Sequence, residues 1–280
     1  MKKLLLVTLI ICCGVQTLKA DTSAKQQTEA APKLVSHTAV YEVSLLKQTS
    51  VLSDAYGNLK MRIQDVGDAW VSQQSSEITL LTHSGREIKT WTTVSYWESK
   101  DGKSFKFMTN FNDSKDGEKV LGSAERDPST GKVIVKYTTP NNRKVELDKN
   151  VFFPIQHLRH LIKLAKAKKI SDDSVVFDGS NGKCKTMDIN SILGEGGPLK
   201  PETLKLMKGS EQLSFPVAMS VFLNPGQDTP DYRILQNITE SGVVEGMTMY
   251  FPRNNSSTQP DYQLVATLKK VELTGVEIER

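Results

Sequence analysis

Two histidines are the residues whose spacing comes closest to a metal site. His157 and His160 lie three positions apart in a segment of helical periodicity, so both could project to one side and share a metal ion. A zinc site needs a third and usually a fourth ligand, and no nearby Cys, Asp or Glu has ligand spacing. We therefore predict no metal site and interpret the pair as histidines that cap a sheet or line a cleft.

Residues 112–117 (NDSKDG) resemble the start of a calcium-binding loop. Such a loop places a bidentate glutamate at its twelfth position, where this chain has Ser123. The missing ligand favours a hairpin turn and not a cation site.

No catalytic nucleophile is indicated. Residues 178–182 (DGSNG) lack the Gly-x-Ser-x-Gly spacing of a nucleophile elbow, so we interpret Ser180 as a turn residue. Asp172 and Asp173 are adjacent, so on a strand they would point to opposite faces and not flank one bond. The glycines of residues 194–197 lack the flanking strand and helix of a dinucleotide-binding turn, and there is no Walker lysine motif. We predict that the protein is not an enzyme and needs no cofactor.

Four aromatic residues could line a groove for a ligand: Trp70, Trp91, Tyr96 and Trp97. Aromatic side chains on strands equally often belong to the core, and both interpretations stay open at this point.

The elements that position these residues are mostly β-strands. Apolar residues alternate with polar ones from Ala39 to Leu45. The same period of two recurs at residues 105–107, 133–137, 247–251 and 264–268. Such alternation is typical of half-buried strands. Turn residues separate the strands, with Asp101-Gly102 as the strongest hairpin signal, and no helix intervenes, so we expect antiparallel pairing.

One segment, about residues 154–169, has helical periodicity instead. Its apolar residues form a stripe: Ile155, Leu158, Leu161, Ile162 and Ala165. Pro154 is compatible with a first helical turn, and lysines crowd the far end, where they complement the helix dipole. We expect this helix to cover one opening or one face of a curved sheet. Residues 194–203 and 224–231 are interpreted as loops rich in Gly and Pro.

The first twenty residues are typical of a bacterial signal peptide. Two lysines precede an apolar run, Leu4–Val15, that is too short to cross a bilayer as a helix, and Ala20 suits a signal peptidase. Leu18 departs from the small-x-small pattern, and a lipid anchor on Cys12 or Cys13 is the alternative. We predict cleavage after Ala20 and a periplasmic location, with no stable membrane anchor.

Loss of this segment removes three lysines, which changes the net charge from +4 to +1. A balanced chain has no broad field for nucleic acid or anionic lipid. Cys184 becomes the single cysteine, so we predict no internal disulfide and a buried thiol. Residues 21–36 are polar and read as a flexible leader, followed by a single domain over residues 37–280.

Several motifs together resemble one family. Phe153-Pro154-x-x-His157, the helix that follows and Phe177-Asp178-Gly179 are similar to the envelope integrity protein B family of alphaproteobacterial periplasmic proteins. Further similar stretches begin at His37, Trp97, Gly122 and Pro230, so the resemblance spans residues 37 to about 273. It implies an open, half-barrel-like spiral of about fourteen antiparallel strands with one prominent helix.

The resemblance also implies a role in envelope maintenance under stress, no enzymatic activity, and a periplasmic protein partner such as a tetratricopeptide-repeat protein. One departure matters physically. The family usually joins a cysteine before the motif tryptophan to a cysteine near the C-terminus, but this chain has Gly67 at the first position and no cysteine in residues 271–280. A bridge closing so long a loop would contribute about 4–5 kcal/mol.

We therefore expect a noncatalytic periplasmic protein that maintains envelope integrity by binding a protein, a peptide or a lipid in a concave groove. The expected groove or motif residues are Trp70, Trp97, Phe153 and His157. A carrier of lipid or lipoprotein acyl chains and a hydrolase of cell-wall material remain the alternatives.

Overall fold

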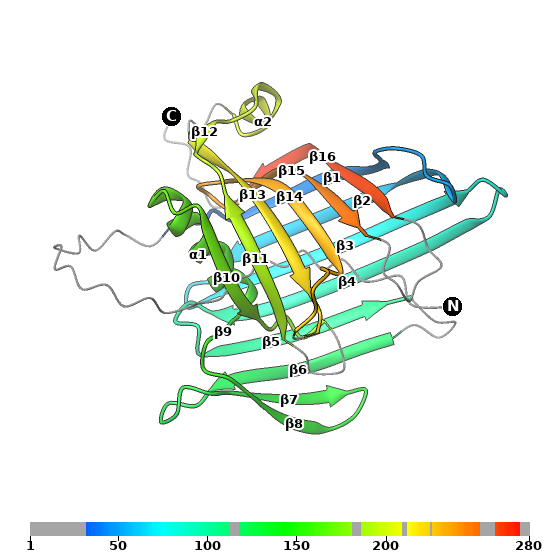
Figure 1. Cartoon of the computed structure of the whole chain (residues 1–280). Helices are drawn as coiled ribbons and strands as arrows, with labels where there is room; N and C mark the ends of the chain where they lie inside the picture. The colour runs from blue at the N-terminus through cyan, green and yellow to red at the C-terminus, as the bar shows by residue number, and fades with distance from the viewer. Residues whose placement is uncertain are drawn as a thin grey trace.

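The computed structural model describes residues 32–112, 118–180, 186–208, 212–224, 226–252 and 261–274. Within them the chain forms one 16-stranded sheet and two helices (Figure 1). The first eight strands are β1 (His37–Leu45), β2 (Leu52–Asp65), β3 (Ala69–Thr82), β4 (Glu87–Ser99), β5 (Ser104–Phe111), β6 (Glu118–Arg126), β7 (Val133–Thr139) and β8 (Arg143–Leu147). The remaining elements are β9 (Val151–Phe152), α1 (Pro154–Lys166), β10 (Ser171–Val176), β11 (Met187–Leu193), β12 (Gly197–Pro198), α2 (Pro201–Leu206), β13 (Leu213–Phe222), β14 (Tyr232–Thr239), β15 (Val244–Phe251) and β16 (Tyr262–Leu273).

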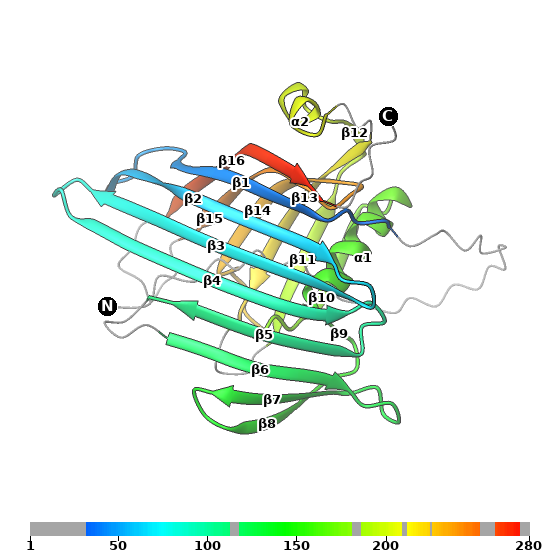
Figure 2. The same cartoon turned by 180° about the vertical axis from the view of Figure 1, so that it is seen from behind.

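The first and the last strand of the chain lie in the middle of the sheet. β1 pairs with both β2 and β16, so the two ends of the described chain lie side by side at the centre. From there one half runs through β2 to β8, and the other runs from β16 through β15, β14, β13, β11 and β10 to β9. Neighbouring strands are antiparallel except β9 and β10, which are parallel. Figures 1 and 2 show the two halves curling toward each other, which confirms the expected half-barrel-like, mainly β architecture.

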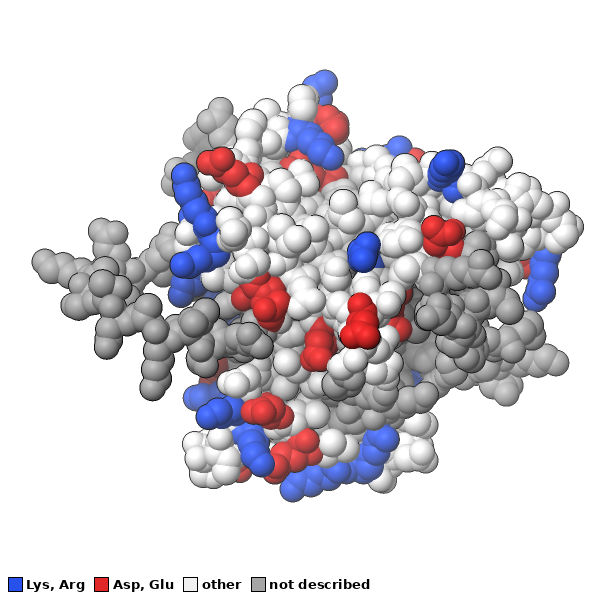
Figure 3. All heavy atoms as spheres, viewed as in Figure 1, with Lys and Arg blue, Asp and Glu red and all other residues white. Residues whose placement is uncertain are grey.

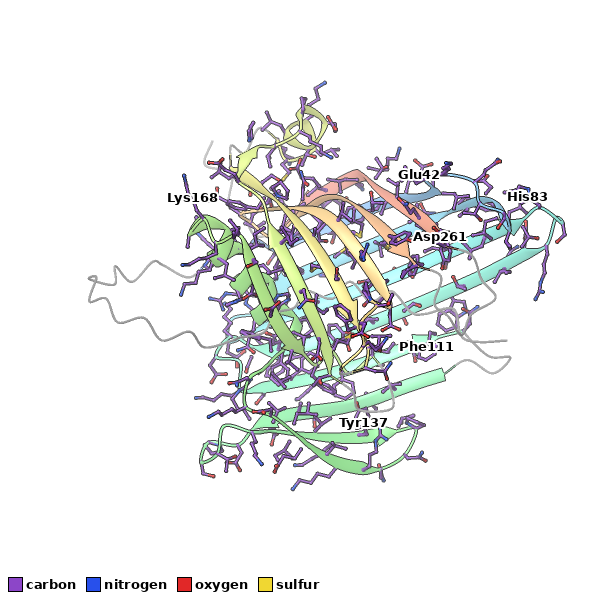
Figure 4. The ribbon with its side chains drawn as sticks, viewed as in Figure 1. Glu42, His83, Phe111, Tyr137, Lys168 and Asp261 are labelled. Carbon is purple, nitrogen blue, oxygen red and sulfur yellow. The ribbon has the colours of Figure 1, made fainter. Side chains whose placement is uncertain are left out.

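The alternation in the sequence determines which side faces inward. In β1, Ala39, Tyr41 and Val43 are buried while Glu42 and Ser44 are exposed. Equivalent inward residues of the other strands form the main core, so side chains occupy much of the space that the curved sheet encloses (Figure 4). The buried face of α1 belongs to the same core, as its apolar stripe predicted.

The helices differ from expectation in two ways. α1 ends at Lys166 and not near residue 169, because the chain turns there and Lys168 adopts a left-handed φ of 55°. The interpretation of residues 194–203 as a loop was wrong, since this stretch contains β12 and the start of α2. Pro201 starts α2 with its fixed φ, and a helix of six residues is too short to show a periodic stripe.

Candidate functional site

The motif residue Phe153 lies where the β9–β10 edge of the sheet packs against the inner face of β5–β7. Phe153, at the start of α1, is fully buried, and its ring stacks on Phe105 of β5 with 4.8 Å between centroids. Phe177, which follows β10, meets Phe107 edge-on at 5.5 Å. Together with Tyr137 of β7 these rings form a second core cluster, which we call the aromatic seam. The seam joins the β9–β10 edge to β5–β7 by packing of side chains.

A buried carboxylate from β4 fixes the start of α1. Glu98 is 1% exposed; its Oε2 accepts the backbone N–H of Ile155 and its Oε1 accepts that of Gln156, both at 2.7 Å. Burial raises the pKa of Glu98 to about 8, against the lowering effect of the two N–H donors and of Arg159. The first N–H groups of a helix have no partner within the helix and need such an acceptor.

The hairpin after β4 leaves room for the side chain of Gln156 in the first turn of α1. Gly102 adopts a φ of +68°, and a Cβ on it would collide with the side-chain amide of Gln156. A glycine is therefore required at this hairpin, as the Asp101-Gly102 signal indicated. Sequence reasoning missed Glu98 although it is part of the Trp97 motif. The available signal was an acid at an inward position of an alternating strand.

His157 is a packed core residue in this structure. It is fully buried, and neither ring nitrogen has a hydrogen-bond partner among the described residues. Burial holds its pKa well below the ordinary value, so the ring is neutral. His160 lies instead near Asp172, with 3.5 Å between Nε2 and Oδ1. The described residues contain no group of three metal-ligating side chains.

Asp178 closes the far side of the seam. Its carboxylate is buried, and it accepts hydrogen bonds from the Tyr96 hydroxyl at 3.3 Å and from the Ser180 N–H and hydroxyl at 2.9 Å. Burial raises the pKa of Asp178. Ser180 is therefore a partner of Asp178 in a turn, and both polar groups are used to hold the backbone.

The two motif tryptophans lie on opposite sides of the sheet. Trp70 of β3 is buried in the main core, with Lys100 Nζ 5.1 Å from its ring centroid. Trp97 of β4 points to the outer face and lines a shallow groove there. Trp70, Phe153 and His157 are thus core residues, so the four residues are not gathered in one concave groove. The reason is that side chains of the curved sheet and of α1 fill the inner side around them.

Gly67 occupies an open turn between β2 and β3. Its φ is +93°, and a Cβ on it would meet no atom within 4 Å. Ser36 links this turn to the end of β16, because its hydroxyl accepts the N–H of Asp65 and its carbonyl accepts that of Thr274, both at 2.8 Å. Hydrogen bonds therefore connect the two regions that the family resemblance relates by a disulfide. Cys184, residues 1–31 and residues 113–117 lie outside the described part of the chain.

A cleft of about 480 Å³ lies on the outer face of β11 and β13–β16, next to the segment that carries α2. Its lining mixes apolar and polar residues, and includes Lys200 and Glu202 as well as Ile192 of β11, which is 66% exposed, and Leu235 of β14, which is 52% exposed. Glu245 anchors the α2 segment beside the cleft, since its Oε2 accepts the Lys200 N–H at 2.9 Å. Figure 3 shows mostly uncharged side chains over this face.

A spiral sheet closed by an aromatic seam, with a helix capped from within, defines a β-barrel-like protein. The EipB-like family model matches residues 28–273, and the chain belongs to that family. A solved structure of similar fold is the crystal structure of a beta-barrel-like protein of a domain of unknown function from Brucella abortus. It is 22% identical, with a TM-score of 0.75, over 87% of this chain and 99% of that one. No curated protein matches the chain. Among the described residues, no helix has the length and apolar character to cross a membrane.

Proposed function

We propose that this chain is a noncatalytic periplasmic protein that helps to maintain the bacterial cell envelope by binding a protein partner. The observation that carries the proposal is the cleft beside α2, where Ile192 of β11 and Leu235 of β14, on either side of β13, are more than half exposed on the outer face. Exposed apolar surface of this kind is typical of a site of interaction. Membership of the EipB-like family supports the envelope-related role.

The placement of the titratable residues supports binding over catalysis. Glu98 and Asp178 are buried and hold backbone N–H groups, and His157 is enclosed in the core. A general acid or base has to reach a substrate proton, and none of these three side chains is accessible. A tetratricopeptide-repeat protein is the partner that the family resemblance favours, and apolar side chains that project from its helices would enter the cleft.

A deletion strain tests the role directly. Cells without the protein should lose resistance to detergent and to antibiotics that act on the cell wall, and the full-length chain should restore it. A variant without residues 1–20 should not restore resistance, because it stays in the cytoplasm. Rescue by that variant, or full resistance of the deletion strain, would contradict the proposal.

Native mass spectrometry distinguishes the kind of ligand. Protein purified from the periplasm should carry no lipid and should bind its protein partner through the cleft. Lipid that co-purifies in a stoichiometric amount would replace the partner-binding proposal with that of a lipid carrier.

A further inference from the structure

The second surface of interest is a row of side chains that crosses the outer face of β4–β8. Strand register places Trp97 opposite Lys106, Lys106 opposite Ser123, Ser123 opposite Lys136, and Lys136 opposite Lys144. Directly opposed residues of antiparallel strands share one face of the sheet. We call these five residues the Trp97 row.

The flanking residues show that this face is the outer one. Tyr96 and Glu98 on either side of Trp97 are buried, as are Phe105 and Phe107 on either side of Lys106. The side chains of the Trp97 row therefore point away from the core. Figure 2 shows no helix in front of β3–β8 on this side.

The charges of the row favour an anionic ligand. Lys136 and Lys144 are opposed and exposed, and like charges at such positions destabilise a sheet. Among the described residues none of the three lysines forms an ion pair with an acid, and Glu146, two positions after Lys144, is paired with Lys132. Neighbouring strands are about 4.8 Å apart, so the cations lie roughly 5 and 10 Å from each other along the row. An extended polymer with regularly spaced acidic groups would match this arrangement.

The groove beside Trp97 favours a sugar as the building block of that polymer. The groove has a volume of about 420 Å³, and it is lined by the Trp97 indole, Met108, Gly122 and the hydroxyl residues Ser95 and Ser123. Lys106 Nζ lies over the Trp97 ring, 5.1 Å from its centroid, so the cation and the indole form one site and a sugar ring would share the indole with Lys106. A sugar ring has an apolar face that packs on an indole and a rim of hydroxyl groups that hydrogen-bond to serines.

We propose that the Trp97 row is a binding site for an acidic polysaccharide. One sugar ring packs against Trp97 in the groove, and acidic groups further along the chain pair with Lys106, Lys136 and Lys144. This site is on a different part of the sheet from the cleft beside α2, so it can be tested independently of the protein partner.

Three soluble polymers separate the contribution of the sugar ring from that of the acidic groups. Polygalacturonate is an acidic polysaccharide, dextran is a neutral polysaccharide, and poly-glutamate is acidic but contains no sugar. Calorimetry on the chain from residue 21 onward should give the tightest binding for polygalacturonate. Trp97→Ala and the double variant Lys136→Ala/Lys144→Ala should each weaken it about tenfold, while Trp97→Phe should retain it. Matched controls are Trp91→Ala on the same face of β4 and Lys163→Ala/Lys205→Ala, which remove the same charges elsewhere; they should change the affinity less than about twofold.

Circular dichroism and thermal unfolding will show whether each variant keeps the fold, which we expect since these side chains are on the surface. The proposal is overturned if polygalacturonate does not bind. It is also overturned if poly-glutamate binds as tightly and Trp97→Ala has no effect, because the surface would then be a simple cationic patch.

Discussion

Trp97 and Glu98 are neighbours on β4, yet they belong to two different parts of the molecule. Glu98 points inward and holds the first turn of α1 beside the aromatic seam, whereas Trp97 points outward into a shallow groove. The inner part consists of packed rings and buried carboxylates with backbone partners. The outer part, around Trp97, has a shallow groove and cations such as Lys136 and Lys144 that are exposed. Most motif residues of this chain therefore maintain the fold, and surfaces available for binding lie on the opposite side of the same strands.

Truncation of a ring in the aromatic seam should cause the largest loss of stability. Phe153→Ala removes a fully buried ring stacked on Phe105, so we expect the free energy of unfolding to fall by about 3–5 kcal/mol. Trp97→Ala is the matched truncation on the outer face and should cost less than about 1 kcal/mol. Urea unfolding measures both, and equal losses would contradict the division between the two faces.

Loss of the helix anchor should have the next largest effect. Glu98→Ala leaves the N–H groups of Ile155 and Gln156 buried without an acceptor, which predicts a loss of about 2–4 kcal/mol in the free energy of unfolding. Glu87→Ala, on the exposed end of the same strand, is the control and should be close to neutral. If the two variants unfold at the same urea concentration, Glu98 does not anchor the helix.

The raised pKa of Glu98 should make a smaller, pH-dependent contribution to the free energy of unfolding. The carboxyl titrates at about 8 in the folded state and near 4.5 when unfolded, so between these values the folded protein binds more protons. Stability from this group is complete below pH 4.5 and is lost as the pH rises toward 8, with a slope of up to about 1.4 kcal/mol per pH unit. Unfolding measured between pH 6.5 and 8 should show this slope in the wild type and a reduced one in Glu98→Gln.

The pKa of Asp178 is raised as well. Asp178→Asn is therefore the control variant, because it should leave the pH-dependent contribution of Glu98 in place. His37 and His157 have lowered pKa values, so they contribute below about pH 6.5 and not in this window. An unchanged slope in Glu98→Gln would show that this carboxyl is already ionised throughout.

The smallest effect is expected at His157. His157→Leu replaces a buried ring without hydrogen bonds by an apolar side chain, so at pH 7.5 stability should change by less than about 1 kcal/mol. At pH 5.5 the variant should gain up to about 1.4 kcal/mol relative to the wild type, because an unfolded histidine takes up a proton that the buried one cannot. A large loss for His157→Leu at both pH values would indicate a polar role for the ring.

The sequence predicted α1 and five of the strands, β1, β5, β7, β15 and β16, because each has a clear local periodicity. Alternation around Tyr41 and the stripe behind Pro154 are visible within a few residues. Features that depend on distant partners were not accessible in this way. Glu98 meets the start of α1 57 positions later, and β1 pairs with β16 at the other end of the domain.

The two tryptophans illustrate the same limit. Both lie on strands. The alternation along a strand does not show which face of a curved sheet is covered by side chains from the other half of the chain. Trp70 is covered by the core, whereas Trp97 lies half-buried on the outer face with Lys106 over its ring. The residues of the cleft beside α2 were also missed, because Ile192 and Leu235 read in sequence as ordinary strand residues.

Binding through the cleft beside α2 is tested most directly by complementation of the deletion strain with the double variant Ile192→Ser/Leu235→Ser. The amount of folded protein in the periplasm is measured in parallel. Phe153→Ala serves as the comparison for loss through instability. We predict that the double variant accumulates to the wild-type level, unfolds at the wild-type temperature and fails to restore detergent resistance. Full resistance at that level would show that the outer face beside α2 is not where this protein acts.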